Sequence, residues 1–205
     1  NVDSYNRWYF RPQVTLTYTI NEVLSARYRY TLRNVNPSLS ELSNVEQWID
    51  SLQVRRGNPG LSPFLYHNNV VEFHVNTAKV KAGFTFSYQY QPRMVMEETL
   101  YDASRGLFIR TYDNQRSFHR FTPELYLNYS PFGDYLRMNI SGGLNHFQLN
   151  GNSYSHTYTD PFYVISLNSD VKNFNFNLLI YKRSYSFSGE TSREADRFNR
   201  LGIGY

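Results

Sequence analysis

The sequence predicts an all-β fold, an antiparallel transmembrane β-barrel segment of about nine long strands with short periplasmic turns and long extracellular loops. Three observations predict this fold. Apolar and polar residues alternate along many segments, which is the pattern of strands with one apolar face. These segments run for about 9 to 14 residues, longer than the ~5–6 of soluble sheets and suited to a tilted membrane crossing. The connections between them alternate between short and long, as in outer-membrane barrels.

The first two strands are expected near residues 8–20 and 23–33, joined by a turn at Asn21–Glu22. Every second residue is apolar or aromatic: Trp8, Phe10, Val14, Leu16, Tyr18 and Ile20, then Leu24, Ala26, Tyr28, Tyr30 and Leu32. The residues between them are polar. In a membrane barrel the apolar face meets lipid and the polar face meets a wet lumen, so this pattern assigns a side to every residue.

A long polar segment, residues 34–68, comes next. Inside it, residues 40–52 carry apolar side chains at helical spacing, which predicts a short helix with Trp48 on its apolar face. Strands three and four are expected at 71–76 and 80–90, with a tight turn near Ala78. The apolar positions of the fourth strand form an unbroken series: Val80, Ala82, Phe84, Phe86, Tyr88 and Tyr90.

Five further strands are expected at residues 120–129, 136–144, 163–167, 174–183 and 201–205. Short turns are expected at 130–134 and 170–173, and long loops at 97–116, 150–160 and 188–196. If the short turns are periplasmic, the first strand starts outside the cell, whereas single-chain barrels have both ends in the periplasm. We therefore expect residues 1–205 to form a partial outer-membrane β-barrel that lacks at least the N-terminal strands.

Composition excludes several other classes of protein. The chain has no cysteine, which rules out disulfides and thiolate chemistry. Its net charge of +4 is scattered along the chain, so nucleic acid is not an expected partner. No apolar run is long enough for a transmembrane helix, and no signal peptide is visible. A soluble antiparallel sandwich remains an alternative, because its inner faces also alternate.

A motif in the long polar segment carries a family resemblance. Residues 57–63 read Gly-Asn-Pro-Gly-Leu-Ser-Pro just before the third strand. This pattern resembles the Gly-Asn-Pro-x-Leu-x-Pro signature of TonB-dependent outer-membrane receptors, which also precedes a barrel strand. The residue after the last proline is Phe64, where that family usually has an acid.

A second segment is similar to a further part of the same family. Tyr112, Asp113 and Asn114 resemble its Tyr-Glu-Asn segment, and Glu124 and Pro131 fit the strand and turn that follow. Gln115 and Thr122 stand where the family has glycine, so this match is weaker.

The resemblance implies part of a receptor in the bacterial outer membrane that imports a scarce nutrient such as a siderophore, glycan or peptide. The implied partners are outer-membrane lipid, the receptor's own plug domain and TonB, both through the missing N-terminal part, the small nutrient ligand and a surface lipoprotein. The alternative is a plug-free adhesin or structural barrel that binds a partner through its long loops. A third option, a soluble β domain, corresponds to the sandwich.

No enzyme or cofactor is expected, because the five histidines show no metal-ligand spacing and no catalytic group stands out. His146 shares the apolar register of its strand, beside Asn145, and we interpret it as part of an aromatic girdle near the outer-leaflet boundary.

Candidate site residues lie in the long polar segment and on the polar strand faces. Residues expected to bind ligand are Trp48, Arg55, Arg56 and His67. Arg55 and Arg56 precede a stiff turn, and paired arginines suit carboxylate or phosphate groups. The basic residues expected to face the lumen are Arg27, Arg29, Arg33 and Arg137.

Overall fold

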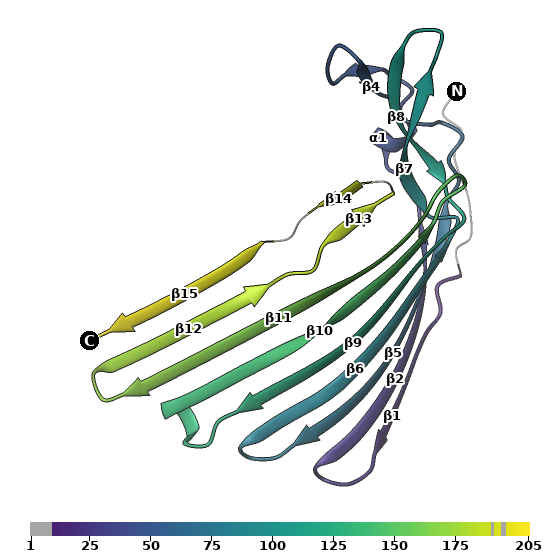
Figure 1. The fold of residues 1–205 in the computed structure, drawn as a ribbon. Coiled ribbons are helices and arrows are strands. Elements are labelled where there is room, and N and C mark those ends of the chain that lie inside the picture. Colours follow the sequence, from purple (N-terminus) through teal and green to yellow (C-terminus); the bar gives the residue numbers. More distant parts are fainter. Residues whose placement is uncertain (1–9, 190, 194–195) are drawn as a thin grey trace.

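A single curved sheet of nine antiparallel strands dominates the computed structural model, which describes residues 10–189, 191–193 and 196–205 (Figure 1). The strands are β1 (Gln13–Thr19), β2 (Leu24–Val35), β5 (Phe64–Asn76), β6 (Val80–Pro92), β9 (Ser117–Tyr129), β10 (Leu136–Asn150), β11 (Ser155–Val171), β12 (Phe174–Lys182) and β15 (Arg197–Gly204). Each pairs with the next along the chain. The predicted fold class and strand number are therefore confirmed. The sheet stays open, with β1 and β15 at its two edges.

Short turns join the strands at one end of the sheet. At the β1–β2 turn, Asn21 Oδ1 accepts hydrogen bonds from the amides of Val23 (2.9 Å) and Leu24 (2.8 Å). At the β11–β12 turn, Lys172 takes a left-handed conformation with φ of 53°. The predicted turns near 21–22, 77–79, 130–134 and 170–173 all lie at this end, and a short 3-10 helix, η1 (Gly133–Tyr135), occupies the third of them.

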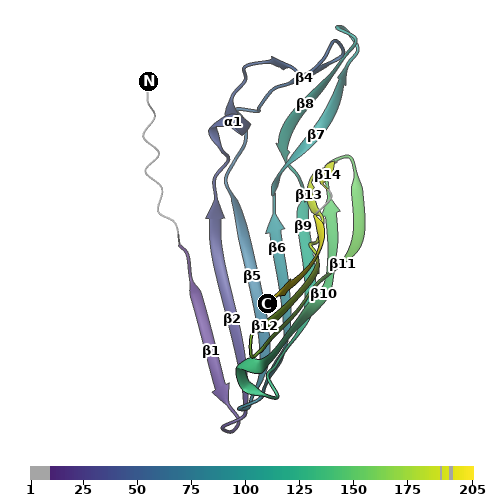
Figure 2. The same ribbon diagram turned by 90° about the vertical axis from the view of Figure 1, so that its left-hand side faces the viewer.

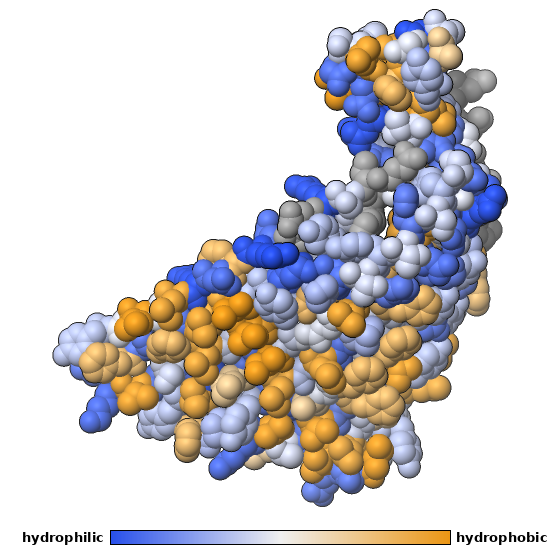
Figure 3. Space-filling view, in the orientation of Figure 1, coloured by the Kyte–Doolittle hydropathy of each residue, from blue (hydrophilic) through white to orange (hydrophobic). Residues whose placement is uncertain are grey.

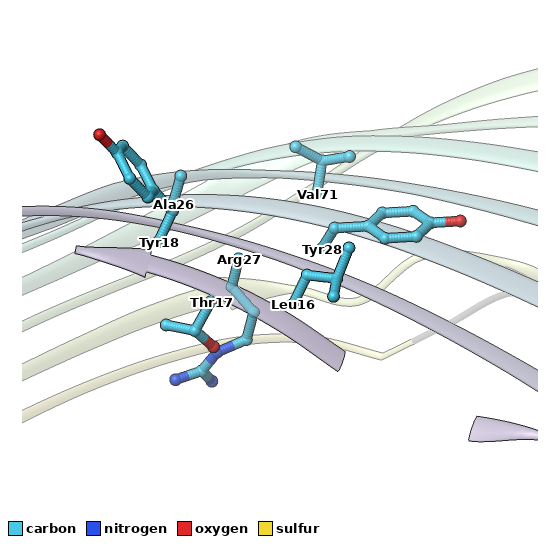
Figure 4. A pocket seen from close by; sticks show the side chains of 7 residues that line it. All are labelled: Leu16, Thr17, Tyr18, Ala26, Arg27, Tyr28 and Val71. Atoms are coloured by element: carbon cyan, nitrogen blue, oxygen red, sulfur yellow. The ribbon is translucent and has the colours of Figure 1, made fainter. Parts of the chain in front are cut away.

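The strand faces follow the predicted alternation. Figure 4 shows it where β1, β2 and β5 adjoin: Thr17 and Arg27 point to the opposite side from Ala26 and Val71. The apolar face carries large exposed side chains, among them Leu16, Phe73, Phe84, Leu125, Ile140, Leu144 and Leu201. Figure 3 shows apolar residues gathered over the lower part of the sheet. Lipid is the environment in which such a face is stable.

Buried apolar side chains gather at the other end, where the long connections lie. The three clusters of buried residues are Met96, Phe118, Phe147 and Leu149; Val54, Leu107 and Ile109; and Leu61, Phe64 and Val95. A sandwich would instead bury the apolar strand faces against a second sheet about 10 Å away. The described sheet has no such second layer, so the soluble sandwich is wrong. No helix in the described ranges is long and apolar enough to cross a membrane.

The long connections contain more regular structure than the sequence predicted. Residues 97–116 are mostly a hairpin of β7 (Val95–Asp102) and β8 (Leu107–Asn114). The expected loop at 150–160 is mainly strand, because β10 and β11 continue as a tall hairpin closed by residues 151–154. Residues 150–160 are mostly polar at successive positions, which is typical of a loop. Strands that extend above a membrane can also carry polar residues at successive positions, because water reaches both of their faces. The last connection holds β13 (Ser186–Ser188) and β14 (Thr191–Arg193).

The helix expected over residues 40–52 is wrong except at its start. α1 covers only Leu39–Leu42, begun by a capping box between Ser38 and Glu41, and the chain turns extended at Ser43. β3 (Gln47–Trp48) and β4 (Gln53–Arg55) then form a small hairpin. Leu42, the last residue of α1, packs against the buried cluster of Leu61, Phe64 and Val95. Trp8, expected on the apolar face of the first strand, lies outside the described residues.

Candidate functional site

Two long connections from different hairpins join to form a second sheet above the barrel strands, here called the loop sheet (β3, β4, β8 and β7) (Figure 2). β4 and β8 pair in parallel, with Gln53, Val54 and Arg55 opposite Phe108, Ile109 and Arg110. Val54, Leu107 and Ile109 are buried together under this pairing. The loop sheet therefore holds Arg55 on a rigid strand.

The Gly-Asn-Pro turn is fixed by backbone contacts with the end of α1. The amide of Gly57 donates to Ser43 O (2.7 Å) and that of Asn58 to Glu41 O (2.6 Å). A Cβ on Gly57 would lie 2.5 Å from both carbonyl oxygens, so only glycine fits this close approach. Leu61, later in the same motif, is buried beside Phe64 and Val95. The motif thus anchors the loop at the point where β5 begins.

The two motif segments that are separate in the sequence contact each other directly. Asn58 Nδ2 donates to Tyr112 O (3.0 Å). Asn114 Oδ1 accepts from the amide of Ser62 (2.8 Å), and its Nδ2 donates to Ser62 O (2.9 Å) and Arg93 O (2.8 Å). The side-chain amides of Asn58 and Asn114 therefore join the loop that precedes β5 to the hairpin that precedes β9.

Sequence reasoning missed Gln115, which it treated as a departure from a family glycine. The side chain is fully buried; it donates to Glu98 Oε2 (2.9 Å) and accepts from the amide of Asn152 (2.6 Å). Asn152 also donates to Asp113 Oδ2 (2.9 Å). These contacts bring a third connection, residues 151–154, against the same site. Only a buried polar side chain next to a motif could have pointed to it.

Four arginines of the loop sheet and its turns share two glutamates. Arg110 and Arg55 approach Glu97 at 3.0 Å and 3.9 Å. Glu46 takes the other two, with distances of 2.8 Å to Arg105 and 3.5 Å to Arg56. The neighbouring predicted residues Arg55 and Arg56 thus turn to different glutamates. Asp102 also lies close enough to Arg105 and Glu46 for its charge to act on both.

The electrostatics of these groups follow from their hydrogen bonds. The two-pronged hydrogen bond from Arg105 holds the pKa of Glu46 below its ordinary value. Nearby, the Ser104 hydroxyl lowers the pKa of Asp102 in the same way. Burial raises the pKa of the Tyr112 hydroxyl, which donates to Glu97. Glu46 and Asp102 are therefore charged and the Tyr112 hydroxyl is neutral at neutral pH.

A cavity of about 520 Å³ lies between the Gly-Asn-Pro turn and the β7–β8 hairpin. Its lining combines Arg56 and Asn58 with Glu98, Leu100 and Asp113 of the hairpin. Trp48 does not line it. That ring is 62% exposed in β3, within a group of exposed apolar residues of the loop sheet: Ile49, Leu52, Leu100, Tyr101 and Phe108. Figure 3 shows apolar surface at this end of the molecule.

The remaining candidate residues lie on the barrel strands. Among those expected in the lumen, Arg27 and Arg29 approach Glu72 at 3.8 Å and 3.3 Å, and Arg137 approaches Asp170 at 3.6 Å. Arg33 pairs across the ladder with Tyr66.

His67, expected to bind ligand, lies in β5, where Nδ1 is 2.9 Å from the hydroxyl of Tyr30. It shares the apolar register of Val71 and Phe73, apart from the loop sheet. In the described ranges, no group of three His, Cys, Asp or Glu side chains could hold a metal ion.

Solved structures of outer-membrane receptors share this arrangement. The siderophore receptor PirA from Acinetobacter baumannii is 11% identical, with a TM-score of 0.62 over 94% of this chain and 34% of that receptor. A mutant of the ferric enterobactin receptor PfeA from Pseudomonas aeruginosa is 12% identical, with a TM-score of 0.62 over 94% and 32%. PirA from Pseudomonas aeruginosa gives 11% identity and 0.55 over 83% and 38%. The chain therefore spans about a third of the receptors it resembles.

Sequence comparison identifies the family directly. No curated protein matches the sequence significantly. Residues 1–198 match the model of the outer membrane protein beta-barrel family, which is nearly the whole chain. The long antiparallel strands and their exposed apolar face agree with this match and with a location in the bacterial outer membrane. The chain belongs to the outer membrane protein beta-barrel family.

Proposed function

We propose that the chain is part of a TonB-dependent outer-membrane receptor that imports a scarce nutrient. The observation that carries this proposal is the contact between the two motif segments. Residues 57–63 and 112–114 each resemble a segment of that receptor family, and hydrogen bonds from Asn58 and Asn114 join them. Two motifs found separately in the sequence thus form one structural unit at the base of the loop sheet.

The length of the relatives supports a partial barrel. Because the chain spans about a third of the siderophore receptors that share its fold, we assign residues 1–205 to one part of a larger barrel of ~22 strands. The plug domain, the remaining strands and the segment that binds TonB then belong to other parts of the same protein. A surface lipoprotein is a further proposed partner on the loop side.

The proposed ligand surface is the loop sheet with the adjoining cavity. It presents Trp48, Arg55 and Arg56 on strands and turns that are held by the barrel. Recognition on loops carried by a rigid scaffold is common. Arg55 and Arg56 can bind carboxylate or phosphate groups of a nutrient, and Glu98 and Asp113 of the cavity can accept hydrogen bonds from it. This role is transport, and none of these residues is assigned a catalytic task.

The test separates an energised transporter from an adhesin. Cells that express the full-length protein would be grown on limiting iron, on a glycan or on a peptide as the only source, with and without functional TonB. A receptor predicts growth that needs both the protein and TonB. Growth that needs neither, together with surface binding that persists without TonB, would support the plug-free adhesin instead.

A further inference from the structure

An unusual row of rings crosses the lipid-facing side of the sheet. Histidine and tyrosine side chains from β2, β5, β6, β9 and β10 follow one another with ring centroids between 4.7 Å and 6.2 Å apart. We call these residues the His–Tyr row: Tyr30, His67, Tyr90, His119, Tyr88, Phe121 and His146. All share the register of the exposed apolar residues on their strands.

The row lies at the boundary between hydrocarbon and headgroups. Tyr90 comes ten residues after Val80, the first residue of β6 above the short turn. At about 3.3 Å per residue and a tilt of roughly 40°, this is a height of about 25 Å, which equals the apolar band of an outer-membrane barrel. His67, His119 and His146 lie at the matching level, each within about five residues of the loop end of its strand. The loop end faces the outer leaflet.

Among β2, β5, β6, β9, β10 and β11, these imidazoles are the only groups at this level of the face that can become cationic. Farther along the sheet, Lys182 of β12 shares the register, but it is buried and paired with Asp160. On β2, β5, β6, β9, β10 and β11, all within the described residues, the lipid-facing register holds no Asp, Glu, Lys or Arg. Three of the five histidines nevertheless lie there. Polar rings are costly in hydrocarbon, and at the wet, charged boundary they can bind a group of matching chemistry.

The imidazoles of His67 and His146 are held with one nitrogen available, whereas both nitrogens of His119 have hydroxyl partners, Tyr88 and Ser117. Nδ1 of His67 lies 2.9 Å from the Tyr30 hydroxyl, and Nδ1 of His146 lies 2.8 Å from Thr159 Oγ1. When these hydroxyls donate to Nδ1, the ring proton is on Nε2. Nε2 of His67 and of His146 has no hydrogen-bond partner among the described residues, so it can donate to an outside group.

We propose that the His–Tyr row is a binding site for the phosphate headgroups of outer-leaflet lipid. Imidazole N–H groups donate to phosphate oxygens, and a bound phosphate favours the protonated ring because opposite charges attract. The tyrosine rings support the acyl chains and sugar faces beside the phosphate, as amphipathic rings do at membrane interfaces. No carboxylate faces the imidazoles to compete; their described neighbours are the hydroxyls of Tyr30, Tyr88, Ser117 and Thr159.

The experiment counts lipids bound to the full-length protein in detergent by native mass spectrometry. The two probes are phosphorylated lipid A and the same lipid after dephosphorylation. Each charged group near a membrane surface changes binding roughly a few-fold. At pH 6 we therefore expect about a tenfold preference for the phosphorylated form, and at pH 8 a clear loss of that preference. The triple variant His67→Phe/His119→Phe/His146→Phe keeps aromatic rings but should lose the preference at both pH values.

His74→Phe is the matched control, because His74 lies on the lumen face, with Nδ1 2.8 Å from the Tyr126 hydroxyl. It should leave lipid preference unchanged. An equal preference in the triple variant and the wild type would overturn the proposal. So would a wild-type preference that does not change between pH 6 and pH 8, a measurement that needs no variant to fold.

Discussion

Placing a charge on the lipid-facing side of β6 gives the sharpest test of the fold. Phe84 lies between Phe73 of β5 and Leu125 of β9 in the ladder, with 37% of its surface exposed. It comes four residues after Val80, about 10 Å above the lower edge of a 25 Å apolar band, so its side chain meets lipid near the midplane. Arginine at this depth should cost about 2–4 kcal/mol.

The adjacent residue is the matched control. Thr85 faces the other way and lies between Glu72 and Glu124 in the ladder. Thr85→Arg therefore places the same charge on the polar face beside two carboxylates, and we expect a change within about 0.5 kcal/mol. The comparison isolates the environment, because the two positions share a strand and a level.

The assay follows folding of the full-length protein into lipid vesicles across a denaturant series, with heat-modifiable migration on gels as the readout. A cost of 2–4 kcal/mol lowers the folding equilibrium constant about 30- to 700-fold for Phe84→Arg. Equal losses for Phe84→Arg and Thr85→Arg would show that the apolar face of β6 does not meet lipid, and the assignment of every strand face would fail with it.

Three further perturbations address the loop region and the proposed ligand surface. Lys182→Met should lower the free energy of unfolding by about 3–5 kcal/mol, because it leaves the buried Asp160 carboxylate without its cation. The double variant Asp160→Asn/Lys182→Met should lose much less. Thermal unfolding measures both, and equally unstable single and double variants would contradict this reasoning. Acidification should free the tip of the β7–β8 hairpin from Glu46. Because the pKa of Glu46 is lowered in the folded protein, its ion pair with Arg105 stabilises the tip above the ordinary glutamate pKa, and this stabilisation is lost as the pH falls through the lowered pKa. A spin label at Ala103 should therefore gain mobility at acid pH, and in Glu46→Gln it should already be mobile at neutral pH. Arg55→Ala/Arg56→Ala should weaken an anionic ligand about tenfold and reduce the salt dependence of binding, with Lys81→Ala on β6 as the control; unchanged affinity would remove these arginines from the site.

The barrel strands could be predicted from the sequence because a membrane enforces a strict rule on every residue. A strand that faces lipid must be apolar at each second position, so the sequence alone predicts which residues of β6, from Val80 to Tyr90, face the lipid. The short turns followed from the interruption of that alternation. The same rule ends above the membrane, where β10 packs Phe147 and Leu149 into a buried cluster and the polar residues 150–160 resemble a loop.

The loop sheet could not be predicted, because its pairing is decided by contacts between distant segments. Trp48 and its apolar neighbours fit a helical face, yet Trp48 pairs with Val54 in a short hairpin, and Val54 pairs in parallel with Ile109 of the next connection. The sequence shows the arginines as a pair, but Arg56 approaches Glu46 of its own connection and Arg55 approaches Glu97 of the next one. Gln115 looked like a defect in a motif, and only the structure shows that its amide joins Glu98 to Asn152.

The parallel pairing of β4 with β8 has a consequence for how the loop sheet of such barrels can change. The two strands arise from different connections, so neither connection can be exchanged alone without leaving an unpaired edge in its neighbour. In evolution, residues 36–63 and 93–116 should therefore change together, while the membrane strands beneath them remain similar. Chimeras that transplant both segments together should display a donor's epitopes, and single-segment transplants should not reach the cell surface in folded form.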